Sequence, residues 1–346
     1  MNKFLSQQID RLSLRQLHKR KSMVSHFKAP NMPPLKSGEF HSYFNTPSIP
    51  EIQFTQEKRD SDYSTGTFSY DSQIRNNGKS NDKVLGYYHR NSRYSDSVNV
   101  ILVHGWRMDD YKNIDSIYLK SFMNAGYNVY HFEMPYHFQR NSIDSAYNGE
   151  LFVTSDIGRT LLSVKQAVSD LRALVKWLKS GTQGKVILIG VSLGGFLTNL
   201  TSTVESDIDI LISVFYANSL ATSIWDTIPG KYIKKDFIKN SFSFGQLTNH
   251  WAVITPSLYR PTVSKNRILL LSAAYDQYIN LEDSNELWAK WGNPRRNIYN
   301  CGHSGIVLLR NKIRNDSLEF INSKLQAGGL HMLVLFFALW IIAGNS

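Results

Sequence analysis

The stretch Lys185-Val186-Ile187-Leu188-Ile189-Gly190-Val191-Ser192-Leu193-Gly194-Gly195 decides the fold. Its aliphatic, β-branched start predicts a short buried strand, and the Gly-x-Ser-x-Gly pattern then opens a helical segment. A sharp turn between strand and helix needs glycine on both sides of the serine, because the backbone is crowded there. Such a turn lifts a serine hydroxyl above the sheet, so Ser192 is the expected nucleophile.

Two further strand ends supply the groups that a serine nucleophile requires. A serine alcohol is a weak nucleophile at neutral pH and needs a general base, which in turn needs an orienting acid. Asp276 follows the aliphatic strand expected at 267–271, and His303 follows the strand expected at 296–299. Parallel strands present their carboxyl ends at one sheet edge, so both should meet Ser192. Asp283 is the competing acid, but its place near a helix N-terminus predicts a capping role.

A third strand end, His104-Gly105-Trp106, predicts the site that stabilises a developing oxyanion. The backbone N–H groups of Trp106 and Leu193 are the expected donors. His104 itself is expected to form a hydrogen bond beneath this loop rather than to act in catalysis. Cys301 lies two residues from His303 and is expected to be a packing residue.

Strands and helices alternate along most of the chain. Strands are expected at 98–103, 127–132, 186–189, 210–215, 267–271 and 296–299, with helices near 114–124, 160–179, after Ser192, and near 281–291 and 306–325. Residues 51–89 predict two or three antiparallel strands, with turns at Thr65-Gly66 and at 76–78. This order predicts a mostly parallel sheet covered by helices on both faces. The aromatic insertion 218–264 is interpreted as a helical lid over a pocket, in preference to a peripheral excursion with its own small core.

The ordered segments VNVILVHGW, YHFEMPYH, ILIGVSLGG, LLLSAAYDQYI and NCGHSG resemble the α/β-hydrolase superfamily over residues 50–325. The resemblance is nearer to dienelactone-hydrolase and peptidase-like esterases than to lipases, because Val191 stands where many lipases have histidine. It implies an α/β-hydrolase fold, a catalytic triad of Ser192, Asp276 and His303, and an oxyanion hole from Trp106 and Leu193. The segment at 133–137 departs from the Asp-x-Pro-x-x-Gly form common in this superfamily.

These residues predict a serine hydrolase that cleaves an acyl ester of a small molecule through an acyl-enzyme. A serine peptidase or an acyltransferase could use the same triad, and a non-catalytic α/β-hydrolase that binds a ligand is the alternative of a different class. The sequence has no Cys/His cluster with zinc spacing and no phosphate-binding loop, so we expect no metal and no cofactor.

The net charge of +11 is concentrated at the N-terminus, where residues 1–36 hold eight Lys and Arg against Asp10 alone. This pattern indicates a basic arm and not a nucleic-acid-binding surface. Residues 5–27 predict an amphipathic helix with an apolar stripe from Leu5, Ile9, Leu12, Leu14 and Leu17. Such a helix either packs on the body or lies on an anionic membrane.

The C-terminal tail 328–346 contains an apolar run at 330–343, which is shorter than the roughly 20 residues of a membrane-spanning helix. This apolar run could form a buried or interfacial helix, or it could act as a tail anchor. The N-terminus lacks the pattern of a secretory signal, and the single cysteine fits a reducing compartment. We therefore expect a cytoplasmic protein, with contact to a membrane surface through the arm or the tail left open.

Overall fold

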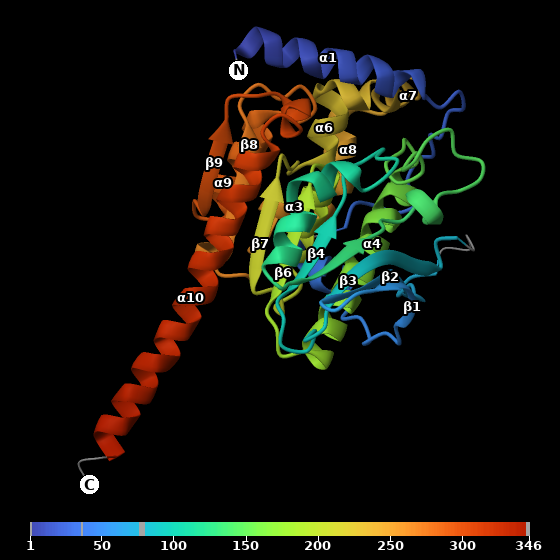
Figure 1. Ribbon diagram of the computed structural model, residues 1–346. Coiled ribbons are helices and arrows are strands. Elements are labelled where there is room, and N and C mark those ends of the chain that lie inside the picture. Colours follow the sequence, from blue (N-terminus) through green and yellow to red (C-terminus); the bar gives the residue numbers. More distant parts are fainter. Residues whose placement is uncertain (1, 36, 76–79, 344–346) are drawn as a thin grey trace.

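The computed structural model describes residues 2–35, 37–75 and 80–343, and their side chains except those of Ser37 and 327–343. Within these residues nine strands form one sheet in the order β1-β2-β3-β5-β4-β6-β7-β8-β9 (Figure 1). The strands are β1 (Gln53–Arg59), β2 (Tyr63–Asp71), β3 (Lys83–Asn91), β4 (Asn99–Val103), β5 (Asn128–Phe132), β6 (Val186–Val191), β7 (Ile210–Val214), β8 (Ile268–Ala273) and β9 (Arg295–Tyr299). From β5 to β9 all neighbours are parallel, whereas β1, β2 and β3 extend the sheet antiparallel beyond β5.

Helices cover both faces of the parallel strands, because successive residues of each strand point to opposite cores. In β4, Ile101 and Val103 belong to one core, and Val100 and Leu102 belong to the other. The first core is closed by α2 (Phe40–Tyr43), α4 (Ile157–Gly181), α5 (Leu193–Thr201) and α9 (Leu281–Lys290), and the second by α3 (Lys112–Asn124) and α10 (Arg310–Ala343). The expected helix-covered, mostly parallel sheet is thereby confirmed.

The expected turn at Thr65-Gly66 is wrong, because both residues lie inside β2. The chain reverses instead between β1 and β2 at residues 60–62, where the Asp60 N–H donates to the Tyr63 carbonyl at 2.9 Å. Gly66 pairs with Gln56 where the β1 register shifts, so this glycine marks a bulge and not a turn. The turn expected at 76–78 lies outside the described residues.

The insertion between β7 and β8 is helical, as expected, and its described residues contain no strand. It holds α6 (Leu220–Asp226), α7 (Lys231–Lys239) and α8 (Phe244–Trp251), with short 3-10 turns at Ile228–Gly230, Ala252–Ile254, Pro256–Leu258 and Lys265–Arg267. A capping box starts α8, in which Ser243 accepts from Gln246 N–H and the Gln246 side chain accepts from Ser243 N–H. Figure 1 places α6 and α7 beyond the carboxyl ends of the parallel strands.

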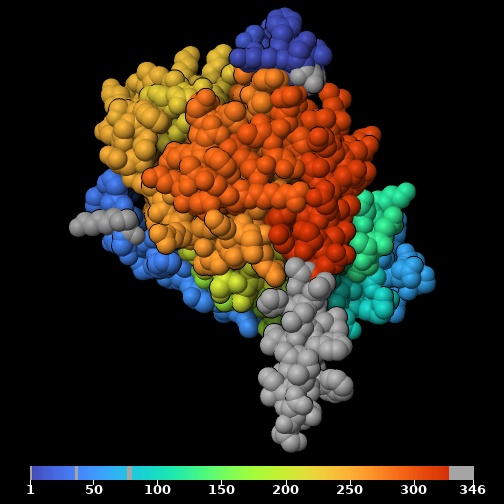
Figure 2. All heavy atoms as spheres, turned by 90° about the vertical axis from the view of Figure 1, so that its left-hand side faces the viewer, coloured from blue at the N-terminus to red at the C-terminus, as the bar shows by residue number. Residues whose placement is uncertain are grey.

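The N-terminal helix α1 (Lys3–Lys19) lies across that same edge, above α6 and α7 in Figure 1. Its buried residues are Ser6, Asp10 and Leu14. The helix expected over 5–27 ends at Lys19, so that expectation is wrong for residues 20–27. Its apolar positions are divided, because Leu14 is buried whereas Leu5 and Leu12 are 50% and 59% exposed. The reason is that α1 attaches to the body through a carboxylate and not through a continuous apolar face. Figure 2 shows this helix (dark blue, top) seated on the orange surface of the C-terminal third of the chain.

The backbone of α10 continues as a helix to Ala343, but the side chains of the apolar run at 330–343 lie outside the described residues. Among the residues that the structure describes, no helix combines the length and apolar character needed to cross a membrane.

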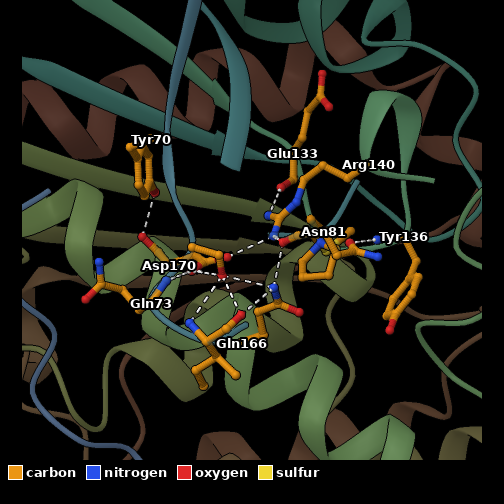
Figure 3. Close-up of polar contacts among 12 residues, drawn as sticks. Tyr70, Gln73, Asn81, Glu133, Tyr136, Arg140, Gln166 and Asp170 are labelled. Atoms are coloured by element: carbon orange, nitrogen blue, oxygen red, sulfur yellow. Dashed lines mark hydrogen bonds and ion pairs between the residues drawn. The ribbon is translucent and has the colours of Figure 1, made fainter. Parts of the chain in front are cut away.

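A buried ion pair holds the chain segment that follows β5 (Figure 3). Arg140 and Asp170 are both fully buried and lie 2.9 Å apart. The Arg140 guanidinium also donates to the backbone carbonyls of Glu133 at 2.9 Å and Asn81 at 3.0 Å, and the Asn81 side chain accepts from Tyr136 N–H at 2.8 Å. These bonds explain how the segment 133–137 is fixed although its sequence departs from the common form.

Candidate active site

Ser192 occupies a strained backbone position between β6 and α5, with φ 56° and ψ −118°. Its N–H donates to the Val214 carbonyl of β7 at 2.8 Å, which fixes the turn against the sheet. A Cβ on Gly190 would lie 2.3 Å from the Gly194 carbonyl oxygen, and one on Gly194 would lie 2.2 Å from the Val103 carbonyl oxygen. The two glycines are therefore required by close backbone contacts, as the Gly-x-Ser-x-Gly pattern predicts.

The structure brings the three predicted side chains into one hydrogen-bonded line. The Ser192 Oγ lies 3.1 Å from His303 Nε2, and His303 Nδ1 lies 2.8 Å from Asp276 Oδ2. They come from the elbow after β6, the loop after β8 and the loop after β9. This line has the geometry by which a histidine removes a serine proton while a carboxylate orients the ring.

Neighbouring residues fix the positions of the Asp276 carboxylate and the His303 imidazole. The Asp276 Oδ1 accepts from the backbone N–H groups of Tyr278 at 2.7 Å and Ile279 at 3.0 Å, which leaves Oδ2 for the imidazole. The Tyr278 ring stacks on the His303 ring with centroids 4.5 Å apart, and Phe215 packs against it at 6.0 Å. The orientation of the imidazole is therefore set on several sides.

The electrostatic environment of His303 favours its charged form. Burial alone lowers the pKa of His303, but the charge and hydrogen bond of Asp276, together with the more remote charge of Asp10, outweigh it and raise that pKa. A base with a raised pKa accepts a proton more readily, and its cation is stabilised once formed.

Trp106 and Leu193, the expected oxyanion donors, line the same cavity as Ser192. A Cβ on Gly105 would lie 3.3 Å from the Ser192 Cβ, so the loop after β4 lies against Ser192. The Trp106 indole N–H donates to the Gly149 carbonyl at 2.8 Å, which anchors this loop.

His104 is buried and lies beneath the loop, as expected. Its Nε2 accepts from Met134 N–H at 3.2 Å, so Nδ1 carries the proton and donates to the Gly105 carbonyl at 2.9 Å. Burial lowers the pKa of His104 well below its ordinary value, which keeps the ring neutral. This histidine therefore ties the segment after β5 to the loop that holds Trp106.

A cavity of about 360 Å³ opens from Ser192 and His303, and most of its lining is apolar. The side chains that line it include Leu17, Trp106, Met108, Ile114, Ile117, Val153, Leu220, Ile224, Ile279 and Val307. The insertion contributes its α6 residues, and α1 contributes Ser13 and Leu17. The insertion thus forms part of the wall of the cavity beside the candidate nucleophile.

Two other residues do not join this hydrogen-bonded line. Asp283 is buried and accepts from the backbone N–H groups of Asn218 at 2.6 Å and Ser219 at 2.9 Å. The expected capping role is wrong, because this carboxylate binds the loop after β7 and Asn280 occupies the N-cap of α9. Cys301 is buried, and burial raises its pKa to about 12, so it remains a neutral thiol at physiological pH.

Sequence reasoning missed the way in which α1 joins the site. The Asp10 carboxylate accepts from the backbone N–H groups of Gln277, His303 and Ser304. Near the other end of α1, the Arg107 guanidinium donates to the carbonyls of Leu17 and Arg20. The available signal was the isolation of Asp10 as the single acid of a basic arm.

Among the described residues, no group of three His, Cys, Asp or Glu side chains is arranged to hold a metal ion. The acids that face His303 are instead engaged by backbone N–H groups, as described above.

No family model matches the chain. The uncharacterized protein YdjC of Bacillus subtilis (strain 168) is 51% identical over 115 residues, which are 99% of YdjC and 33% of this chain. The uncharacterized protein Rv2627c of Mycobacterium tuberculosis is 25% identical over 193 residues, which are 53% of this chain and 42% of that protein.

Solved structures share the fold at low identity. An acetyl xylan esterase from Paenibacillus sp. R4 has a TM-score of 0.62 at 14% identity, with 90% of this chain and 99% of that chain covered. The acylaminoacyl peptidase of Pyrococcus horikoshii has a TM-score of 0.53 at 17% identity, with 81% of this chain and 42% of that chain covered. The chain therefore has the α/β-hydrolase fold of these structures. Through its identity to almost the whole of YdjC, it belongs to the family of that Bacillus subtilis protein.

Proposed function

We propose that this protein is a serine hydrolase that cleaves carboxylic esters through an acyl-enzyme. The observation that carries the proposal is the hydrogen-bonded line from Ser192 through His303 to Asp276 at the mouth of an apolar cavity. A binding protein of this fold has no need to keep a strained serine in hydrogen-bond contact with an oriented imidazole.

In the proposed reaction Ser192 Oγ attacks the ester carbonyl carbon while its proton passes to His303 Nε2. The oxyanion that forms is stabilised by the N–H groups of Trp106 and Leu193. The bond from carbon to the leaving oxygen then breaks, and His303 returns the proton to the departing alkoxide. Water, deprotonated by His303, attacks the acyl-enzyme, and Ser192 recovers its proton as the carboxylic acid leaves.

The lining of the cavity favours an apolar acyl group. Aliphatic side chains from α1, α3 and α6 surround the space next to Ser192, so each methylene of an acyl group bound there is removed from contact with water. Burial of one methylene contributes about 0.8 kcal/mol, which corresponds to roughly fourfold in kcat/KM. We expect p-nitrophenyl butyrate and hexanoate to be cleaved faster than the acetate, by about that factor per methylene until the cavity is filled.

A fluorophosphonate probe tests the proposal directly. Wild-type protein should be labelled at Ser192, and Ser192→Ala should not be labelled. Ser180→Ala, at an exposed position of α4, is the matched control and should be labelled like wild type. Failure of the folded wild type to react with the probe would sink the proposal. Parallel assays with p-nitrophenyl esters and aminoacyl anilides separate an esterase from a peptidase.

We also propose that the outer face of α1 contacts anionic membranes. Phe4 is 72% exposed, and Leu5 and Leu12 are at least half exposed. The basic side chains of Lys3, Arg11 and Arg15 are exposed on the same helix. Exposed apolar residues among basic residues are typical of helices that lie on a membrane surface.

A further inference from the structure

The N-terminal helix reaches the candidate active site through one carboxylate. Asp10 is fully buried, and its Oδ2 accepts from Gln277 N–H at 3.1 Å and from His303 N–H at 2.9 Å. Its Oδ1 accepts from Ser304 N–H at 2.8 Å. One side chain therefore binds the residue next to the acid Asp276 and two residues of the histidine loop.

The histidine loop is shaped to receive this carboxylate. A Cβ on Gly302 would lie 2.5 Å from Asp10 Oδ2 and 2.7 Å from Asp10 Oδ1, distances that real Cβ atoms do not show. Glycine at position 302 therefore leaves the space that Asp10 fills. The packing of Gly302 and the three hydrogen bonds are separate observations, and both indicate that the two loops and α1 form one unit.

The second end of α1 is attached beside the oxyanion loop. Arg107 follows Trp106 and donates to the Leu17 carbonyl at 2.7 Å. The helix thus spans from the loops of Asp276 and His303 to the loop of Trp106, and its residues Ser13 and Leu17 line the cavity. Figures 1 and 2 show α1 lying over this edge of the molecule.

We infer that Asp10 is a positioning residue of the hydrolase, whose carboxylate fixes the Asp276 loop and the His303 loop relative to each other. This inference rests on the proposed function. Charge-assisted bonds from a carboxylate to backbone N–H groups are strong, and a buried donor that loses its acceptor is costly. Without Asp10, three N–H groups at the edge of the site lose their partner, and the His303 loop loses the bonds that fix it to the Asp276 loop.

The test compares Asp10→Asn with Asp109→Asn. Asp109 forms an exposed ion pair at 2.6 Å with Arg20, the residue that follows α1, and also accepts from Asn148. The control therefore removes an acid near the end of α1 that has no bond to the loops of Asp276 and His303. For Asp10→Asn we expect kcat on p-nitrophenyl butyrate to fall by about 10- to 100-fold with little change in KM, because the catalytic groups are misplaced while the cavity remains. Asp109→Asn should behave like wild type.

The pH profile separates positioning from a merely structural role. The groups that face His303 are Asp276, Asp10 and the phenol of Tyr278. The negative charge of Asp10 is one of the causes that raise the pKa of His303. The acidic limb of kcat/KM should therefore move to lower pH in Asp10→Asn, and it should stay in place in Asp109→Asn.

A second variant covers the case in which Asp10→Asn does not fold. Gly302→Ala leaves α1 unchanged but displaces the carboxylate, and it should also lower kcat, with an unchanged circular dichroism spectrum. The inference is overturned if folded Asp10→Asn or Gly302→Ala keeps the wild-type kcat and pH profile while wild type is labelled by the fluorophosphonate. If wild type is not labelled, the hydrolase proposal itself fails, so the two failures are distinguishable.

Discussion

His303 has to be neutral to accept the proton of Ser192, so its pKa sets the lower pH limit of the proposed activity. Burial acts to lower this pKa, but the charge of Asp276 and that of Asp10 raise it overall. We expect kcat/KM for p-nitrophenyl butyrate to fall, as the pH decreases, through a midpoint above the ordinary imidazole value of about 6.5. Rates measured at constant ionic strength across the range would give the midpoint, and a midpoint at or below that ordinary value would contradict the proposed role of these two charges.

The residues of the proposed triad were predictable because each follows a strand whose pattern is strong. The aliphatic runs before Ser192 and Asp276 and the glycine-bounded loop around His303 place all three at one sheet edge. Asp10 was not predictable in the same way, because its partners are backbone N–H groups of residues more than 250 positions away. Every residue except proline has a backbone N–H group, so the amino-acid types at these positions do not reveal which of them bind Asp10.

At the scale of single elements, the structure differs most from the sequence-based expectations where an element is held by polar contacts. The strands β4 to β9 lie within a few residues of their expected bounds, because aliphatic runs define buried parallel strands. The helix α1 was expected to carry an apolar stripe, yet with Leu14 it also buries Ser6 and Asp10, and it exposes Leu5. Asp283 was expected to cap α9, yet it binds the loop after β7. Hydropathy patterns describe apolar burial and carry little information on such polar contacts.

The pair of Arg140 and Asp170 connects the helix α4 to the segment after β5. Both side chains are fully buried, so Arg140→Met alone leaves an unpaired charge and should lower the free energy of unfolding by about 3–5 kcal/mol. The double variant Arg140→Met with Asp170→Leu should be less destabilised than the single variant. Urea unfolding followed by circular dichroism measures both values.

A matched control for this pair is the exposed ion pair of Arg295 and Glu319, whose side chains are 42% and 68% exposed. Arg295→Met should cost at most about 1 kcal/mol, because water screens an exposed pair. Equal costs for Arg140→Met and Arg295→Met would show that the buried pair does not hold the segment.

In the proposed hydrolase, α6 should determine the length of acyl chain that is accepted. Ile224 is buried and lines the cavity, so Ile224→Phe fills space that a longer chain would occupy. We expect the ratio of kcat/KM for p-nitrophenyl hexanoate to that for the acetate to fall about tenfold or more, since two or more methylenes lose their place. Ile238→Phe, at a 57% exposed position of α7 in the same insertion, should leave the ratio unchanged. An unchanged ratio in Ile224→Phe would place the acyl group elsewhere.

At the scale of the whole molecule, α1 presents two different faces. The face with Ser6, Asp10 and Leu14 is buried, with Asp10 bound to the loops of Asp276 and His303, and the roughly opposite face exposes Leu5 and Leu12. Ligand contact on the outer face would therefore act on a helix that is hydrogen-bonded to the loops of Asp276 and His303. This arrangement makes a membrane surface the most informative partner to test.

We expect the 346-residue chain to co-sediment with vesicles rich in phosphatidylserine and not with vesicles of phosphatidylcholine alone. Binding should weaken as salt is raised, because exposed Lys and Arg each contribute about 1 kcal/mol near an anionic surface and salt screens this attraction. The variant Leu5→Asp with Leu12→Asp adds charge to the outer face of α1 and should reduce binding, whereas Ile143→Asp, at a 99% exposed loop position, should not. The double variant still contains the C-terminal tail 328–346. If it binds vesicles as well as wild type does, another part of the chain is responsible, and a membrane role for α1 is contradicted. If only the double variant loses binding, α1 is the helix that contacts the membrane. Because α1 also carries Asp10, vesicles should then alter kcat in wild type and not in the double variant.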